Sequence, residues 1–497
     1  MSIDSTYSNL LDAISSLQEG QTLTENLCVT NEDSGNPLVS LFFEIAAMRS
    51  RPEEDVLNLF FKAFESDQLS ALKILFWARD IRGGQGERRA FRTILPYLAN
   101  SSTPLLRANI HLIPEYGRWD DLFALFGTPL EGDALALIDS ALTGSDVQPL
   151  CAKWMPREKS AKSGIARKIR KHMNLSPSAY RKLLSRLTKV VETDMCANKW
   201  DGIKYSSVPS VAMNVYRKAF ERHSPERWSS YLNGLESGKE TVNASVLYPH
   251  QVVKPFIKER YAYDMSPESD APADNRLLEQ QWKALPNYLL KNPHRILPVV
   301  DTSGSMYTGD SLQPIDVSVS LGLYIAERNN GPFKDHFITF SDTPSLQRLR
   351  GETLKEKVSN LLRADWGMST NVEAVFDLIL SQAKKNDISE EDMPSMVLIL
   401  SDMEFNQCAT NYSMTAMQSI ASKYAEAGYK IPSIIFWNLN ARGNNFPVKF
   451  DEQGAALVSG FSPSILTHIL SSGTITPIDV VNKVLESERY SLITKPS

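Results

Sequence analysis

The 497-residue sequence has little of several features that would place it in a special class of protein. Its four cysteines are scattered and none belongs to a Cys-x-x-Cys pair, so neither a disulfide framework nor a zinc ribbon is expected. The seven histidines show no spacing typical of zinc ligands. No apolar run approaches the roughly 18 residues that a membrane helix needs, and the first residues lack the regions of a signal peptide. We therefore expect a reducing, cytoplasmic compartment and no membrane partner.

The overall composition is that of an ordinary globular protein, with 42% apolar and 22% charged residues. The length predicts two to four domains. A net charge of −5 hides an asymmetry, because residues 151–190 contain twelve Lys or Arg and one acid, Glu158. This segment carries +11, so the rest of the chain carries −16. A block this basic in an acidic chain indicates a polyanionic partner.

The first part of the chain, residues 1–225, is expected to be helical. Residues 36–48, 56–64 and 69–78 are apolar at helical spacing, and Gly or Pro separates such segments. Without a fixed repeat length, the expected structure is an irregular HEAT-like array of helix pairs. Residues 226–292 are expected to form a connecting segment with an exposed loop at 264–275.

From residue 293 onward the pattern alternates between strands and helices, which predicts a mostly parallel, doubly wound sheet. The predicted fold class is therefore α followed by α/β. The ligand site of such a sheet lies beyond the carboxyl ends of its strands. Strands are expected at 295–300, 336–340, 396–400, 433–437 and 455–458, and helices at about 314–329, 352–363, 371–384, 411–427 and 462–471.

Three loops at this edge of the sheet carry oxygen ligands. Asp301, Ser303 and Ser305 follow the first strand, Thr370 precedes a helix, and Asp402 follows the central strand. Carboxylate and hydroxyl oxygens suit Mg²⁺, with Mn²⁺ or Ca²⁺ as alternatives. We expect one metal site here. The competing interpretation is that Asp301 and the serines only cap a helix.

The basic block predicts a surface for nucleic acid, with RNA preferred to DNA. Lys and Arg bind phosphates without reading sequence, and Trp154, Tyr180 and Tyr205 could stack on bases. The alternative is a solvated helix face, although such faces normally interleave charges of both signs. The candidate RNA-binding residues are Lys153, Arg157, Lys159, Lys162, Arg167, Lys168, Arg170, Lys171, Arg181, Lys182 and Arg186.

Two further features have simpler interpretations. The glycine-rich segment 83–86 lacks the ending of a phosphate-binding loop and follows no strand, so a turn between helices is expected; RNA contact by Arg82, Arg88 or Arg89 is the alternative. No pair of nucleophile and base stands out, and we expect no enzyme. Asp402 with Glu404 leaves a hydrolytic alternative open.

The three metal loops resemble those of a von Willebrand factor A domain with a metal-ion-dependent adhesion site. The resemblance implies that Ser303, Ser305 and Thr370 touch the metal directly, whereas Asp301 and Asp402 act mainly through waters. It also implies that an Asp or Glu of a partner protein completes the coordination. The third loop departs from the usual Asp-Gly, because Met403-Glu404 follows Asp402; Glu404 could add a charge or reject an acidic partner.

A helical array followed by such a domain resembles the Ro family, whose TROVE module is a ring of HEAT-like helices closed by a von Willebrand A domain. The resemblance is closer to an uncharacterised TROVE-like branch, through the motifs at 76–84, 117–120, 153–160, 401–405 and 458–462. It implies a non-catalytic RNA-binding scaffold, acting in RNA surveillance or in a ribonucleoprotein, for structured or single-stranded RNA. The alternative is a protein-interaction or assembly module that acts through the metal site without RNA.

Overall fold

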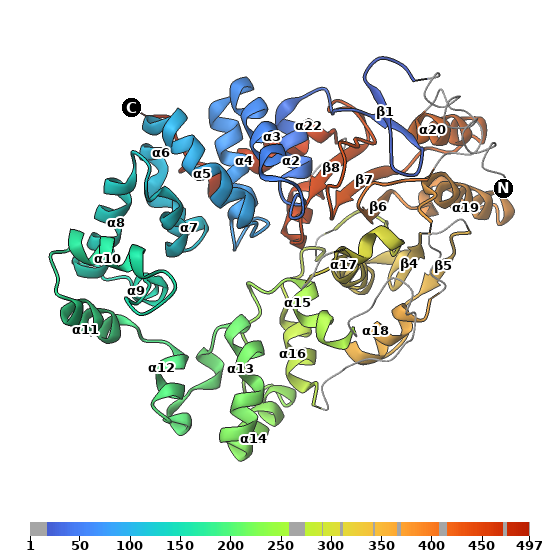
Figure 1. Cartoon of the computed structure of the whole chain (residues 1–497). Coiled ribbons are helices and arrows are strands. Elements are labelled where there is room, and N and C mark those ends of the chain that lie inside the picture. The colour runs from blue at the N-terminus through green and yellow to red at the C-terminus, as the bar shows by residue number, and fades with distance from the viewer. Residues whose placement is uncertain are drawn as a thin grey trace, which may run out of the picture.

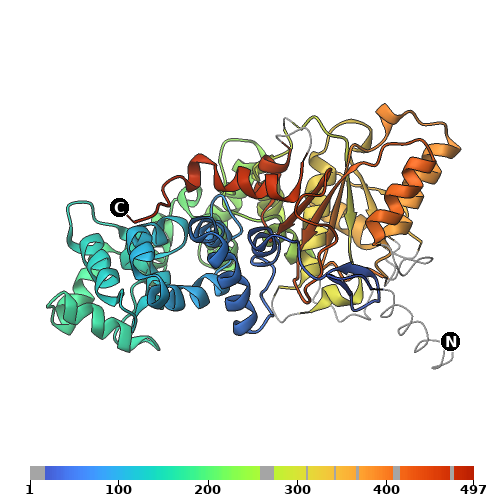
Figure 2. The same cartoon turned by 90° about the horizontal axis from the view of Figure 1, so that it is seen from above.

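The computed structural model describes residues 17–257, 274–290, 292–308, 312–340, 343–364, 369–406, 415–470 and 475–496. An array of helices occupies the first part of the chain and a six-stranded sheet with its own helices the second (Figure 1). Most of the predicted loop at 264–275 lies outside the described residues. Seen from above, the array and the sheet lie at opposite ends of the molecule (Figure 2).

The helices of the array form for recognisable local reasons. In α3 the buried side chains Val56, Phe60 and Phe64 recur at helical spacing. Helix α4 begins at Asp67, whose Oδ1 accepts hydrogen bonds from the amides of Leu69 and Ser70 at 2.9 and 3.1 Å. The array comprises α2 (Pro37–Glu44), α3 (Glu53–Ser66), α4 (Gln68–Arg79), α5 (Arg89–Ser101), α6 (Thr103–Asn109), α7 (Ile113–Tyr116), α8 (Glu131–Thr143), α9 (Pro149–Trp154), α10 (Ser163–His172), α11 (Pro177–Leu187), α12 (Val191–Cys196), α13 (Ser210–His223), α14 (Pro225–Glu236), α15 (Pro249–Val253) and α16 (Arg276–Ala284).

Both ends of this array contact the sheet domain. Helix α2 packs against β8 (Ala455–Ser459), and α15 packs against α17 (Pro314–Arg328). Between these contacts the helices curve away from the sheet domain and return to it (Figure 1). One hydrophobic core runs from α2 into the sheet, and a second, separate core lies around Phe220, Trp228 and Tyr231. The helical array predicted from periodicity is confirmed.

The sheet has the strand order β5-β4-β3-β6-β7-β8, and all neighbouring strands are parallel except β4 and β5. The predicted mostly parallel sheet is therefore confirmed. Edge strand β5 was not predicted, because it has three residues and Leu346 is exposed. The other strands are β3 (Ile296–Val300), β4 (His336–Thr339), β6 (Met396–Ser401) and β7 (Ser433–Asn438), with β5 at Leu346–Arg348; the helices are α18 (Leu354–Leu362), α19 (Val372–Lys385), α20 (Ala416–Glu426), α21 (Leu466–Ile469) and α22 (Pro477–Leu485).

Two features of this topology position the candidate site. After β3 the chain builds β4 and β5 on one side and then crosses to β6 on the other, so the strand order reverses between β3 and β6. Ligands of such sheets bind at this switch point, beyond the carboxyl ends of the strands. In addition, the hairpin of β1 (Gln21–Leu23) and β2 (Val29–Asn31) pairs with the sheet domain through the bridges Leu27–Asn406 and Asn31–Phe446.

Candidate functional site

Two aspartates follow directly on the two strands at the switch point. The amide of Asp301 donates to the Leu400 carbonyl at 3.1 Å, which continues the pairing of β3 with β6. The Asp301 carboxyl group accepts from the Ser401 hydroxyl at 2.5 Å and from the Ser303 amide at 2.8 Å. Asp402 follows Ser401, the last residue of β6. The ends of neighbouring parallel strands thus bring both carboxyl groups to one place.

The three predicted hydroxyls lie in the loops around these acids. The Oγ atoms of Ser303 and Ser305 are 3.1 Å apart. Thr370 lies two residues before α19, and its hydroxyl donates to the Glu404 carbonyl at 2.7 Å, in the loop that also carries Asp402. A hydroxyl that donates its proton keeps its oxygen lone pairs for another interaction. Metal coordination therefore remains open to Thr370.

The two carboxyl groups are buried beside each other. Burial raises the pKa of Asp301 to about 7; the charge of Asp402 adds to this, and hydrogen bonds from Ser401 and Ser303 oppose it. Burial also raises the pKa of Asp402, against the effect of the Ser305 hydroxyl. Its Oδ2 atom has no hydrogen-bond partner in the described part of the chain, and Arg442 Nη1 lies 3.9 Å from it.

A hard divalent cation fits this donor set. Two ionised carboxylates close together in a buried place repel each other, and a cation between them would offset that cost. Among the described residues, no group of three or more His, Cys, Asp or Glu side chains could hold a metal. A metal at the switch point would therefore use the hydroxyls and water as further ligands, as Mg²⁺ does. Its open coordination positions would suit an external carboxylate.

The sequence left the role of Glu404 open. In the structure this residue contacts the N-terminal hairpin. Its carboxylate accepts from the Glu25 amide at 2.8 Å and from Asn445 Nδ2 at 2.7 Å. Its carbonyl accepts from Asn26 Nδ2 at 2.7 Å. Burial raises the pKa of Glu404 to about 7. These contacts tie the hairpin to the loop that carries Asp402.

The basic block forms the exposed faces of α10 and α11. Ala166 and Ile169 of α10 and Tyr180 and Leu184 of α11 are buried, so the charged residues between them face outward. We define the basic surface as its exposed members, for which no acidic partner is found within the described ranges: Lys159, Lys162, Arg167, Lys171, Arg181, Lys182 and Arg186.

The remaining candidates of the block are less available. Acids pair with Lys153 (Glu192, 3.3 Å), Lys168 (Glu131, 2.8 Å) and Arg170 (Glu158, 2.5 Å). Glu131 and Glu192 lie outside the block in sequence. Arg157 is half-buried, and burial lowers its pKa.

The predicted stacking by Tyr180 and Tyr205 is wrong. Their exposed fractions are 1% and 5%, because both rings belong to hydrophobic cores. Trp154 is half-buried, and the Arg118 guanidinium lies 3.8 Å from the centre of its ring. Base stacking by the two tyrosines is thus excluded as the basis of any RNA contact.

Arg79 and Arg118 of the motif regions at 76–84 and 117–120 belong, with Arg92, to an ionic network around the buried acids Asp120 and Asp121. Arg79 Nη2 lies 2.8 Å from Asp121, and Arg92 bridges Asp121 at 2.6 Å and Asp120 at 2.8 Å. Arg118 completes the network through Asp120 at 2.8 Å. These charges stabilise the packing of α4 and α5 on the 3₁₀ helix at Trp119–Leu125.

The glycine-rich segment is a turn, as expected. A Cβ atom at Gly84 would lie 1.9 Å from the Trp77 carbonyl oxygen, so the turn has no room for a side chain. Arg82 donates to the Glu115 carbonyl, and Arg89 donates to the carbonyls of Met48 and Arg51. Arg82 thus uses one side-chain nitrogen, and Arg89 two, for contacts within the protein.

The same turn contacts the C-terminal part of the chain. Asp80 accepts from Arg489, with Nη2 at 2.7 Å, and from the Tyr490 hydroxyl at 3.1 Å. Gln85 Oε1 accepts from the Ser462 amide at 2.8 Å. The motif regions at 76–84 and 458–462 therefore meet at the junction of the two domains.

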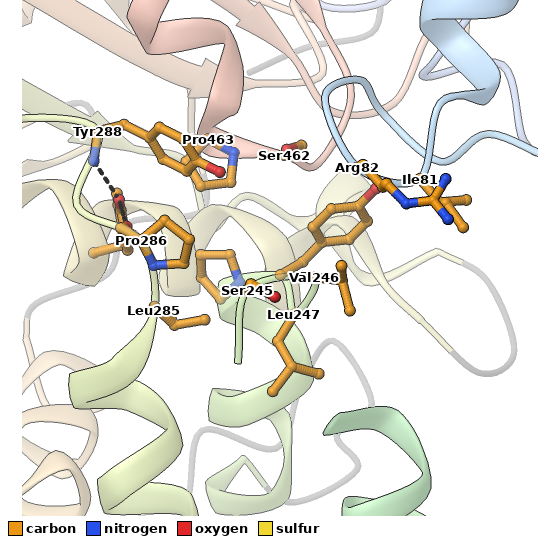
Figure 3. A pocket seen from close by; sticks show the side chains of 13 residues that line it. Ile81, Arg82, Ser245, Val246, Leu247, Leu285, Pro286, Tyr288, Ser462 and Pro463 are labelled. Carbon is orange, nitrogen blue, oxygen red and sulfur yellow. Dashed lines mark hydrogen bonds between the residues drawn. The ribbon is translucent and has the colours of Figure 1, made fainter. Parts of the chain in front are cut away.

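A small pocket lies near this junction, lined by Arg82, Leu247, Pro286 and Pro463 among others (Figure 3). In the same place the Tyr288 amide donates to the Tyr324 hydroxyl at 3.1 Å. The volume of the pocket, about 10 Å³, admits at most one water, so no organic ligand is expected there.

Among the described helices, none has the length and apolar character needed to cross a bilayer.

Comparisons with known proteins define the family. The model described as "Domain of unknown function (DUF2828)" matches residues 24–140 and 147–293. The model described as "Domain of unknown function (DUF7788)" matches residues 295–493. An uncharacterized protein of Acanthamoeba polyphaga mimivirus is 30% identical over 516 residues, covering 94% of this chain and 87% of the relative.

A search of solved structures matches the crystal structure of the Deinococcus radiodurans RO (RSR) protein. The match covers 90% of this chain and 92% of that chain, with 12% sequence identity and a TM-score of 0.29. At these values the match carries no argument about function. The family models and the mimivirus relative show that the chain belongs to the family of DUF2828 proteins, with a DUF7788 domain after the helical array.

Proposed function

We propose that this protein is a non-catalytic RNA-binding scaffold that holds RNA phosphates on its basic surface. The observation that carries the proposal is the concentration of exposed cations, without acidic partners in the part of the chain that the structure describes, on two consecutive helices and the loop before them. A solvated helix face normally carries charges of both signs, so seven cations of one sign favour a surface that binds a polyanion. The resemblance of a helical array followed by a von Willebrand A-like domain to the Ro family favours RNA over DNA.

The second part of the proposal is a metal-ion-dependent adhesion site of the von Willebrand A type. Ser303, Ser305 and Thr370 would bind Mg²⁺ directly, while Asp301 and Asp402 would hold its waters. The bound ion would supply a Lewis-acidic position for the carboxylate of a protein partner. Two observations favour binding of a cation here: the raised pKa of Asp301, and the Asp402 Oδ2 atom, which has no hydrogen-bond partner among the described residues.

The RNA proposal is tested by charge reversal of Arg167, Lys171, Arg181 and Arg186 to Glu. RNA affinity should fall by at least about a hundredfold at moderate salt, nearly equally for unrelated sequences, since phosphate contacts carry no sequence information. A matched control reverses Glu131 and Lys168 together, which exchanges the partners of one existing pair. Equal RNA affinity of the wild type and the fourfold variant would contradict the proposal.

A protein-interaction or assembly module is the second candidate function, and the geometry around Asp301 and Asp402 favours it. Such a module requires the metal and no RNA. Pull-down of partner proteins in Mg²⁺ and in EDTA, with wild type and Asp402→Asn, separates the two functions. Partner capture that needs Mg²⁺ and Asp402, from a protein that purifies without RNA, would move this function to first place.

A further inference from the structure

A cavity of about 390 Å³ lies between α2, α3 and the loop that contains Asn444 and Phe446. It therefore spans the two domains. Pro37, Leu59 and Phe446 give it apolar walls, while acids and two basic residues surround the remaining space. The residues of α2 and α3 that line the cavity recur at helical spacing. They are Pro37, Ser40 and Glu44 on α2, and Asp55, Asn58, Leu59 and Lys62 on α3; Met48, which follows α2, also lines the cavity.

Glu44 is the residue that gives this cavity a chemical preference. It is the last residue of α2, lines the cavity and is only 3% exposed. Within the described part of the chain, its carboxyl group forms no hydrogen bond and no ion pair. Burial raises the pKa of this group to about 8, with the charge of Arg51 opposing the shift and that of Asp55 adding to it. A buried carboxyl group of this kind is normally satisfied by a partner.

The two basic residues that line the cavity are already engaged. Arg51 Nε lies 2.7 Å from Asp55, and its Nη1 donates to the Arg442 carbonyl at 3.1 Å. Lys62 Nζ lies 3.6 Å from Asp33. Glu32 adds a further acid at the exposed rim. The cavity thus has an excess of negative charge and, among the described residues, no cation of its own directed at Glu44.

We propose that this cavity is a binding site for a primary alkylammonium group, with its charged end on Glu44 and its alkyl chain between Pro37, Leu59 and Phe446. An organic cation fits better than a metal ion, because much of the wall is apolar and hard cations need several converging oxygens. The ammonium would also find hydrogen-bond acceptors in the Ser40 hydroxyl and the Asn58 side chain, both of which line the cavity.

Such a ligand would link the two domains, since Phe446 belongs to the sheet domain and Glu44 to the array. A neighbouring hollow shares Glu32, Arg51, Asp55 and Asn444 with this cavity and extends to Arg442 and Glu404, beside the candidate metal loop. The chemistry is available either from a free small amine or from a lysine side chain of a partner protein.

The test is isothermal titration calorimetry of the full chain with n-butylamine hydrochloride at pH 8.5. Binding is expected for the wild type, and the Glu44→Gln variant should bind at least about tenfold more weakly, because one partner of a buried charge pair is absent. The control variant is Glu54→Gln, an exposed acid on the neighbouring helix α3 that does not line the cavity. It should bind as the wild type does.

Two probes separate the sources of the ammonium. If the protein binds each of the two compounds, N-acetyl-lysine N-methylamide and n-butylamine, in separate titrations, the site is assigned to a lysine side chain of a partner. If it binds n-butylamine but not the lysine derivative, the site is assigned to a free amine. Leu59→Trp, which fills the cavity, should abolish both and serves as the second variant if Glu44→Gln does not fold. Absence of butylammonium binding to the wild type, equal binding of uncharged n-butanol, or equal binding to Glu44→Gln would overturn the proposal.

Discussion

Two regions of the molecule use arginine in contrasting ways. In the network of Arg79, Arg92, Asp120 and Asp121, the exposed fractions of Arg79 and Asp121 are 2% and 0%, and each charge meets its opposite within 3 Å. On the basic surface of α10 and α11 the cations are exposed and lack acidic partners among the described residues. The network serves packing, whereas the surface is available to another molecule. Arginine-rich motifs therefore indicate function only once their partners are known.

The largest effect is expected where the network is broken. Asp121→Asn leaves the buried Arg79 without a charged partner and Arg92 with Asp120 alone, so the free energy of unfolding should fall by about 3–5 kcal/mol. Urea denaturation measures this. Asp133→Asn, which breaks the exposed Arg107–Asp133 pair, is the control and should cost no more than about 1 kcal/mol. Similar losses of unfolding free energy for both variants would show that the buried charges of the network contribute no more to stability than an exposed ion pair does.

The second prediction sharpens the role of the basic surface. Arg181→Glu with Arg186→Glu should flatten the salt dependence of RNA binding by about one unit of log–log slope for each phosphate that the protein no longer binds. Unfolding free energy should change by no more than about 0.5 kcal/mol for each substitution, because both side chains are exposed. Binding at several salt concentrations gives the slope. An unchanged slope would show that these two arginines do not contact RNA phosphates.

The third prediction concerns pH and the buried acid Glu44. Its pKa in the folded protein is about 8 against an ordinary 4.5, so between these values the folded state binds more protons than the unfolded state. Stability from this group is complete below about pH 4.5 and is lost as the pH rises toward 8, by about 2 kcal/mol between pH 5 and 7. Asp301 and Glu404 act in the same direction. The measurement is therefore the difference between wild type and Glu44→Gln, whose pH dependence should be shallower.

The last prediction concerns the metal loops. Saturating Mg²⁺ should stabilise the wild type by about 1–3 kcal/mol, as binding to the folded state alone requires. Asp402→Asn should lose this gain and should be slightly more stable than the wild type in EDTA, because one of two repelling carboxylates is neutralised. Thermal unfolding with Mg²⁺ and with EDTA checks both. A rise in melting temperature of equal size in the variant would place the ion elsewhere.

Patterns local in sequence predicted much of this structure. The five strands with long apolar runs, the alternation after residue 293 and the placement of Asp301 and Asp402 at strand ends all follow from short segments. Edge strand β5 and helix α22 were missed; β5 has three residues and little apolar character, and α22 lies beyond the helix predicted at 462–471, after which no element was predicted.

What could not be predicted depends on partners far away in the chain. Glu404 binds the amide of Glu25, 379 residues earlier. Lys153 and Lys168 meet acids outside their own block, so counting charges in one window overstates the positive surface. Tyr180 and Tyr205 were misassigned because aromatic residues among basic ones give no sign of which face they occupy.

The contacts of Asp80 have a consequence for how this chain is made. Asp80 is buried, yet its partner Arg489 lies 409 residues later, and Asn109 likewise binds the backbone of Thr494, 385 residues away. During synthesis the first helices emerge with only the local partners of these groups, the Arg82 amide for Asp80 and the Leu105 carbonyl for Asn109. The distant contacts can form only when almost all of the chain has been translated. The array therefore cannot complete its packing helix by helix, as a simple repeat protein can. Its last folding step waits for residues 489–494.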